Sequence, residues 1–248
     1  MNVLYEEETF NITGLVSFPG SGNTWTRHLI HLATGVYTGS FYFDLDLYSK
    51  GFLGEREPWY SGSTIVQKFH ERYNKDFEVS KAVLLIREPF PAILSLANFL
   101  EAGHTGSAHI LPYHQDWPKF ILHSAYNWLS LAKSWIESPT NLLVIHYEHL
   151  RLQPVNNLRK ICDFLQTSCS YLHHPCFQRR LEGSFRRVNS LPLRTQKDVA
   201  RKARYPLEIR ELVSRGSDHL NHLLKERGHE PLPLNLYQYY SPATEQNV

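Results

Sequence analysis

Four short apolar runs recur along the chain, and each is followed by a polar segment and then by helical spacing of apolar residues. The runs are Gly14–Phe18, Thr64–Phe69, Ala82–Arg87 and Asn141–His146. The last two, AVLLIR and NLLVIH, are nearly continuous, which is typical of parallel strands covered on both faces. Strands that alternate with helices predict an α/β fold.

Helical spacing predicts five helices: Thr24–Thr34, Pro91–Leu100, Phe120–Trp135, Pro154–Leu165 and Pro206–Glu226. Pro154 suits the first turn of its helix because a proline there lacks only an N–H that would have no partner. Residues 229–248 are rich in Pro and Tyr and have no regular spacing. No repeat or linker interrupts the pattern. We therefore predict one domain over residues 1–248, with a core of about 14–228.

The segment FPGSGNTW follows the first run and opens the first helix. Gly20 and Gly22 allow the backbone to approach an anion, and the amides and positive end of a helix attract it. Thr24 adds a hydroxyl donor. The pattern predicts a phosphate or sulfate site, although a tight strand–helix turn without ligand has the same pattern. The Gly-Lys-Ser/Thr of nucleoside-triphosphate loops is absent, which disfavours kinase or NTPase chemistry.

Arg87 stands at the end of the third run, and Ser95 follows eight residues later. An arginine at the carboxyl end of a parallel strand faces the usual ligand crevice, and its planar fork suits a phosphate. Ser95 is placed to reach the same anion from the next helix. Taken alone, an arginine at this place is better explained by a structural ion pair.

Composition and charge set further bounds. The 248 residues are 42% hydrophobic with a formal charge of +2, so whole-protein attraction to nucleic acid is not expected. Residues 151–204 carry 12 Lys/Arg against 3 Asp/Glu, which fits a solvated face or a polyanionic ligand. We expect no signal peptide and no transmembrane segment. The odd count of cysteines (Cys162, Cys169, Cys176) leaves one disulfide with a free thiol, or three thiols.

Several motifs together resemble the sulfotransferases that use 3′-phosphoadenosine 5′-phosphosulfate (PAPS). They are Pro19–Trp25, Lys68-Phe69-His70, Arg87 and Ser95 with Pro89 between them, and Tyr147-Glu148-His149, in family order. The resemblance spans about Leu15 to Arg187. It implies a three-layer α/β/α sandwich with a central parallel sheet and a P-loop-like fold, and PAPS as sulfuryl donor without a metal. The runs SFPGSGNTWTRHLI and EGSFRR are similar to the branch with WSC domains, which implies a sialic-acid-type glycan acceptor and a Golgi location.

The resemblance also implies residue roles. His70 is the expected general base and Lys68 the expected electrostatic stabiliser, while Glu71 either orients His70 or replaces it as base. The expected cofactor-binding residues are Pro19, Gly20, Ser21, Gly22, Asn23, Thr24, Trp25, Arg87, Ser95, Tyr147, Phe177, Arg186 and Arg187. Trp25 is expected to stack on adenine. Phe177 is either a second stacking ring or an ordinary core residue, and Arg179 and Arg180 compete with Arg186 and Arg187.

Two departures from the family accompany these roles. Gly20 replaces a family lysine, and Lys68 or Arg27 is expected to compensate. The polar, His-rich segment 101–120 is interpreted as an acceptor-side loop with Tyr113 and Trp117 stacking on a sugar, or as plain surface. His104, His109 and His114 fit no standard metal spacing. The alternative functions are a non-catalytic binding module and a divergent nucleotide kinase, and the alternative location is the cytoplasm.

Overall fold

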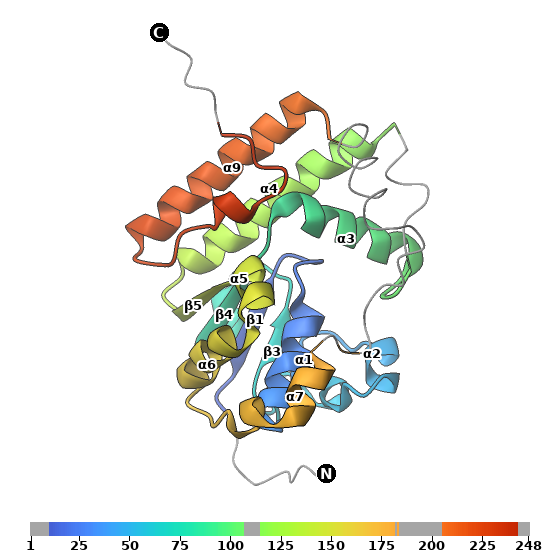
Figure 1. Ribbon diagram of the computed structural model, residues 1–248, viewed down its shortest axis with the longest axis vertical. Coiled ribbons are helices and arrows are strands. Elements are labelled where there is room, and N and C mark those ends of the chain that lie inside the picture. Colours follow the sequence, from blue (N-terminus) through green and yellow to red (C-terminus); the bar gives the residue numbers. More distant parts are fainter. Residues whose placement is uncertain (1–9, 107–114, 182, 184–204, 243–248) are drawn as a thin grey trace.

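A single parallel sheet forms the centre of the protein in the computed structural model, which describes residues 10–106, 115–181, 183 and 205–242. Its strand order is β2-β3-β1-β4-β5, and every pairing is parallel (Figure 1). The strands are β1 Thr13–Ser17, β2 Gly39–Ser40, β3 Gln67–Phe69, β4 Lys81–Ile86 and β5 Asn141–His146.

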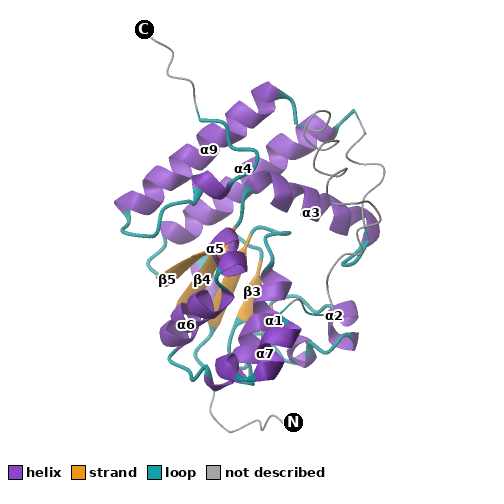
Figure 2. Ribbon diagram, viewed as in Figure 1, coloured by secondary structure: helices purple, strands orange, loops and turns teal. Residues whose placement is uncertain are grey.

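Helices connect and cover these strands (Figure 2). The longer ones are α1 Asn23–Thr34, α3 Pro89–Ala102, α4 Trp117–Ile136, α6 Pro154–Leu165 and α9 Leu207–Glu226. The shorter ones are α2 Leu45–Ser49, α5 Tyr147–Leu152 and α7 Pro175–Arg180. Short 3₁₀ turns lie at Leu53–Arg56, Lys75–Phe77, Ser170–His173 and Leu234–Leu236.

The two faces of the sheet are covered by different helices because successive strand residues point to opposite sides. Val16 and Leu84 pack into a cluster with α3, α4 and α9. Their neighbours Leu15 and Val83 pack into a second cluster with α1 and α6. These two buried layers explain why the strand sequences read as nearly continuous apolar runs. They confirm the predicted α/β/α sandwich.

The predicted elements differ from the observed ones mainly at their ends. Residues 64–66 are not in the strand that was predicted to begin at Thr64, and β3 holds only Gln67–Phe69. Helix α3 begins at Pro89 rather than Pro91, since a proline is accommodated at the first helical position. The two-residue strand β2 and the short helices α2, α5 and α7 are too brief to give a periodic signal.

The sheet topology gathers distant residues at one edge. β1 lies between β3 and β4, with Val16 opposite Phe69 and Ser17 opposite Leu85. Chain segments that leave these three strands therefore emerge side by side at the carboxyl ends. This is the crevice at which open α/β sheets bind ligands.

A disulfide joins Cys162 in α6 to Cys169, which resolves the pairing that the odd cysteine count left open. The side chain of Cys176 lies outside the described residues. Within the part of the chain that the structure describes, no helix has the length and apolar character needed to cross a membrane.

Candidate active site

The loop between β1 and α1 is held in a conformation that only glycine adopts readily. Gly20 and Gly22 have φ of +83° and +95°. A Cβ at Gly20 would overlap the main-chain oxygen of Ala92 in α3, and one at Gly22 would lie 2.7 Å from the ring of Tyr147. The loop is therefore packed between α3 and Tyr147, which explains why no lysine occupies position 20.

The start of α1 faces the cavity with its own amides. Gly22 is the N-cap residue and no side chain caps the helix, so the first N–H groups have no capping acceptor. Asn23 ties the helix to β1, because its Nδ2 donates to the carbonyl oxygen of Leu15 at 2.9 Å and to the Oγ of Ser17 at 3.2 Å. Uncapped amides at the positive end of a helix form an anion site.

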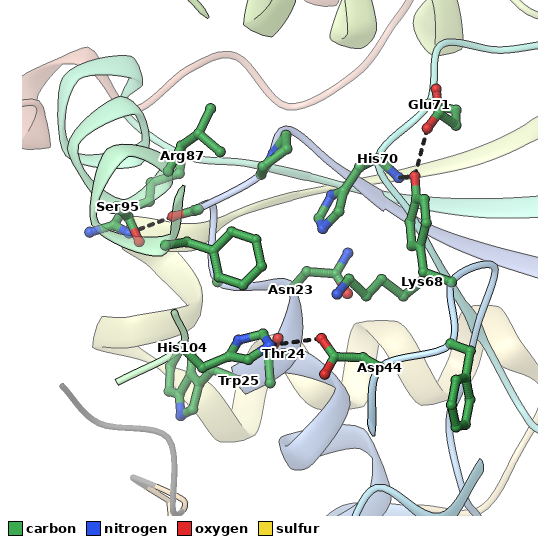
Figure 3. Close-up of a pocket in the computed structure, with 17 residues that line it drawn as sticks. Asn23, Thr24, Trp25, Asp44, Lys68, His70, Glu71, Arg87, Ser95 and His104 are labelled. Carbon is green, nitrogen blue, oxygen red and sulfur yellow. Dashed lines mark hydrogen bonds and ion pairs between the residues drawn. The ribbon is translucent and has the colours of Figure 1, made fainter. Parts of the chain in front are cut away.

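A cavity of about 650 Å³ lies against this loop. Ten of the predicted site residues line it: Pro19, Gly20, Gly22, Asn23, Thr24, Trp25, Lys68, His70, Arg87 and Ser95. They come from β3 itself and from the segments that follow β1, β3 and β4. Figure 3 shows His70 and Lys68 at one end of the cavity and Arg87 with Ser95 at the other. Ser21 and Tyr147 are not among the lining residues; Ser21 is fully buried, and Tyr147 supports the loop from behind.

Arg87 is held in place by the loop and by an aromatic ring. Its Nη1 donates to the carbonyl oxygen of Gly20 at 2.7 Å, and its guanidinium carbon lies 4.4 Å above the ring centre of Tyr147. Trp25 meets the same tyrosine edge-on, at 5.8 Å between ring centres. Among the described residues Arg87 has no ion pair, so the alternative of a structural ion pair fails. The remaining donors are available for an anion.

His70 has a defined tautomer. Its Nδ1 lies 2.7 Å from the main-chain oxygen of Ser17, and a carbonyl oxygen only accepts, so Nδ1 carries the proton and Nε2 has a free lone pair. Burial, followed by the charge of Lys68, lowers the pKa of His70 to about 3. The imidazole is therefore neutral at physiological pH and can accept a proton.

Lys68 and His70 reach the cavity from the same face of β3, while Phe69 between them is buried in the core. This is the alternation predicted for the Lys-Phe-His segment. Burial is the main cause that lowers the pKa of Lys68. The Tyr42 hydroxyl donates to the Glu71 carboxylate at 2.8 Å, and the hydroxyl oxygen of Tyr42 accepts from the main-chain N–H of His70. Glu71 thus acts on the backbone of His70 through Tyr42, and no hydrogen bond joins it to the imidazole among the described contacts.

The comparisons with known proteins agree with this geometry. The model of the sulfotransferase domain family matches residues 78–204, about half of the chain. The chain belongs to the sulfotransferase domain family. The chain is 37% identical over 186 residues to WSCD family member CG9164 of Drosophila melanogaster, and 36% identical over 186 residues to WSCD family member GA21586 of Drosophila pseudoobscura pseudoobscura. Each match covers 73% of this chain and 58% of the relative's length.

A solved structure shows the same fold. The crystal structure of mouse sulfotransferase SULT7A1 complexed with PAP matches with a TM-score of 0.50 and 15% identity, over 90% of each chain. The shared fold agrees with the parallel sheet and flanking helices described above, and it bears out the fold expected from the sequence.

Three expectations for the sulfotransferase site need correction. Phe177 is 2% exposed inside the second core cluster, so its ring does not face the cavity and the ordinary core alternative holds. Arg27 is fully buried and paired with Glu55, so it does not compensate for the missing lysine. Trp117 is 3% exposed within the first core cluster, so it is not placed to stack on a sugar.

Other expected residues fall outside this geometry. Arg186, Arg187, Tyr113, His109 and His114 lie outside the described residues. The indole Nε1 of Trp25 donates to the main-chain oxygen of Leu181 at 2.6 Å, so Leu181 lies beside a residue of the cavity lining. Arg179 and Arg180 are exposed on α7 and do not line it.

Tyr42 and Asp44 are among the cavity residues that the sequence reasoning missed, whereas His104 belongs to the segment interpreted as an acceptor-side loop. Tyr42 and Asp44 follow β2, and the Nε2 of His104 lies 2.7 Å from an Asp44 carboxylate oxygen across the cavity (Figure 3). Asp44 also accepts from the Leu47 amide at the start of α2. The sequence carried a helix-capping signal at Asp44, but nothing local placed that aspartate opposite a histidine 60 residues away.

Proposed function

We propose that this protein transfers a sulfuryl group from PAPS to a hydroxyl of a carbohydrate acceptor of the sialic-acid type, with His70 as general base. The observation that carries the proposal is the Nε2 lone pair of His70, which faces the same cavity as the uncapped start of α1 and the ammonium of Lys68. An anion loop, a cation and a base thereby converge on one point, which is the arrangement that transfer of an anionic group to a hydroxyl requires.

The described residues fit PAPS at both ends. The amides after Gly22 and the hydroxyl of Thr24 suit the 5′-phosphosulfate. Arg87 and Ser95 suit the 3′-phosphate, because a guanidinium fork and a hydroxyl both donate to phosphate oxygens. Trp25 offers a half-buried aromatic face for adenine. Arg186 and Arg187 stay predictions for the same ligand.

In the proposed reaction, bound PAPS supplies the sulfur atom, whose bond to the acceptor oxygen forms as its bond to the 5′-phosphate oxygen breaks, the electron pair staying on phosphate. His70 receives the hydroxyl proton on Nε2 and keeps its orientation through the Ser17 carbonyl. Lys68 stabilises the charge that develops on the leaving phosphate oxygen. The low pKa of His70 in the free protein is raised when an anion binds beside Lys68, which prepares the imidazole to accept the proton.

The proposal also covers the cellular location of the protein and the extent of its domain. A Golgi lumenal location is supported by the Cys162–Cys169 disulfide, because disulfides persist in oxidising compartments. A single sulfotransferase domain over residues 1–248 is supported by the one sheet to which all described strands belong. The chain spans 58% of the length of the WSCD relatives. The identity of the acceptor is therefore part of this proposal.

Calorimetric titration with 3′,5′-ADP beside ATP–Mg²⁺ tests the donor. We expect 3′,5′-ADP alone to bind, and Arg87→Ala to weaken it by about tenfold or more, since a hydrogen bond to a charged group contributes about 1.5–3 kcal/mol. Arg215→Ala, at an exposed position of α9 away from the cavity, is the matched control. Binding of ATP–Mg²⁺ in place of 3′,5′-ADP would support the kinase alternative and refute the proposal.

A transfer assay with labelled PAPS tests the base. His70→Ala should lower kcat by about 10²–10⁴-fold while 3′,5′-ADP still binds, because general-base catalysis contributes on that order. If His70→Ala retained full transfer, His70 would not be the general base, and the Glu71 carboxylate would be the remaining candidate for that role.

A further inference from the structure

A second cavity lies on the other side of His70. It has a volume of about 660 Å³ and shares Pro19, His70, Glu71 and Leu96 with the first. The loop residues from Gly20 to Trp25 that line the first cavity do not line the second, and neither do Lys68, Arg87 and Ser95. His70 thus stands in a wall between two chambers. In-line transfer needs donor and acceptor on opposite sides of the moving group, so the second chamber is the place for the acceptor if the proposed function holds.

Among the described residues that line the second cavity, Arg72 is the one cation, and the walls are partly apolar and partly polar. Phe18, Phe77 and Leu131 form its apolar part, and Arg72, Asn74 and Asn127 its polar part. Apolar walls with a few polar groups are typical of small-molecule sites. A sugar presents both kinds of surface, and its orientation is then fixed by the polar groups.

The guanidinium of Arg72 in this cavity is positioned by two uncharged side chains, Asn127 and Tyr126. Its Nη2 donates to the Oδ1 of Asn127 at 3.2 Å, and its guanidinium carbon lies 5.4 Å from the ring centre of Tyr126. The amide of Asn127 is itself oriented by His123, 3.0 Å from its Nδ2. Both partners come from α4, so a helix rather than a loop positions the guanidinium.

No carboxylate neutralises this guanidinium within the described part of the chain. The neighbouring carboxylate, Glu71, is engaged by the Tyr42 hydroxyl, and Tyr42 lines the first cavity only. The positive charge of Arg72 therefore remains available to the second cavity. A planar guanidinium with free N–H groups binds a carboxylate through two parallel hydrogen bonds.

We propose that Arg72, positioned by Asn127 and Tyr126, determines specificity by binding a carboxylate of the acceptor. The acceptor class is then an acidic sugar whose carboxylate and reacting hydroxyl span the distance between Arg72 and His70. This inference rests on the proposed function and adds to it the residue that selects an acidic acceptor over a neutral one. Surface arginines also stack on aromatic rings for packing alone, and the test separates that role from recognition.

The test compares the methyl glycoside of sialic acid with its methyl ester, which keeps the hydroxyls and removes the charge. With labelled PAPS, we expect the wild type to favour the free acid by about tenfold or more in kcat/KM. Arg72→Gln should raise KM for the acid by a similar factor and leave kcat at saturation, KM for the ester and 3′,5′-ADP binding unchanged. Arg72→Lys should recover part of the preference, since lysine keeps the charge and loses the fork.

Three results would overturn the assignment. The first is equal transfer by the wild type to acid and ester, and the second is an equal loss of activity on both in Arg72→Gln. The third is the same effect from Arg215→Gln on the distant α9 surface as from Arg72→Gln. In each case 3′,5′-ADP binding would remain, so the proposed sulfuryl transfer would stand while Arg72 lost its role. If the wild type bound no 3′,5′-ADP and transferred to neither acceptor, the proposed function would fail and this inference with it.

Discussion

Two buried carboxyl groups, Glu88 and Glu148, lie next in the chain to Arg87 and Tyr147, which hold each other beside the first cavity. Glu88 follows Arg87, is 3% exposed, and accepts from the main-chain N–H of Tyr239 at 2.6 Å. Glu148 follows Tyr147 and accepts from the main-chain N–H of Glu88 at 2.9 Å. Burial, with a smaller contribution from Glu148, raises the pKa of Glu88 to about 7. Burial also raises the pKa of Glu148 above its ordinary value.

This pair predicts a pH-dependent stability. Below the ordinary glutamate pKa of 4.5 the side chain of Glu88 is protonated in both folded and unfolded chains. Between 4.5 and about 7 only the folded chain keeps the proton, so stability falls as the pH rises through this range. A rise of the pKa from 4.5 to about 7 corresponds to about 3 kcal/mol of unfolding free energy, most of it lost by about pH 8.

Glu88→Gln tests the prediction because glutamine keeps the acceptor for Tyr239 and removes the titration. Urea unfolding at a series of pH values gives the unfolding free energy of each protein. We expect the difference between wild type and variant to change by about 3 kcal/mol between about pH 5 and about pH 8, with the variant gaining relative stability at high pH. Glu208→Gln, at an exposed position of α9, is the control. Parallel curves for wild type and Glu88→Gln would refute the reasoning.

Three further predictions follow from the packing of the site. Gly20→Lys should destabilise the fold by about 1–3 kcal/mol in urea unfolding and should abolish 3′,5′-ADP binding. The reason is that φ of +83° and the contact with α3 exclude a side chain at this position. An active, stable variant would contradict this. Glu55→Gln should cost about 3–5 kcal/mol, since it leaves the buried Arg27 charge without its partner, whereas a loss under about 1 kcal/mol would show that the pair is solvated. The pKa of His70, followed by NMR titration, should be about 3 in the free protein and should rise when 3′,5′-ADP binds, as the anion offsets Lys68; an unchanged value would place the anion elsewhere.

The parts of the site that the sequence predicts are those set by neighbours along the chain. The loop from Pro19 to Trp25 carries its own glycines and begins its own helix, and the alternation of Lys68 and His70 follows from the strand that holds them. Arg87 follows a strand whose apolar run is unmistakable. The sandwich fold follows from the same apolar runs, because they require cover on both faces.

The parts that it does not predict depend on packing between distant segments. Phe177 and Trp117 are aromatic residues in segments that were expected to face a ligand. Only the packing of the two core clusters shows that both are buried. Arg27 has the spacing of a cavity residue, yet Glu55 holds it inside the protein. The contact between Asp44 and His104 joins segments separated by α2, β3, β4 and α3, so no local pattern reports it.

The hydrogen bond between Glu88 and Tyr239 has a consequence for biosynthesis. The acceptor is made 151 residues before the donor, so during translation the nascent chain carries Glu88 without the amide that later binds it. Glu148 can engage Glu88 as soon as β5 has paired with β4, but the support behind Arg87 is completed only when the segment after α9 has emerged from the ribosome. All five strands of the described sheet are therefore synthesised before the residue whose amide completes the support behind Arg87.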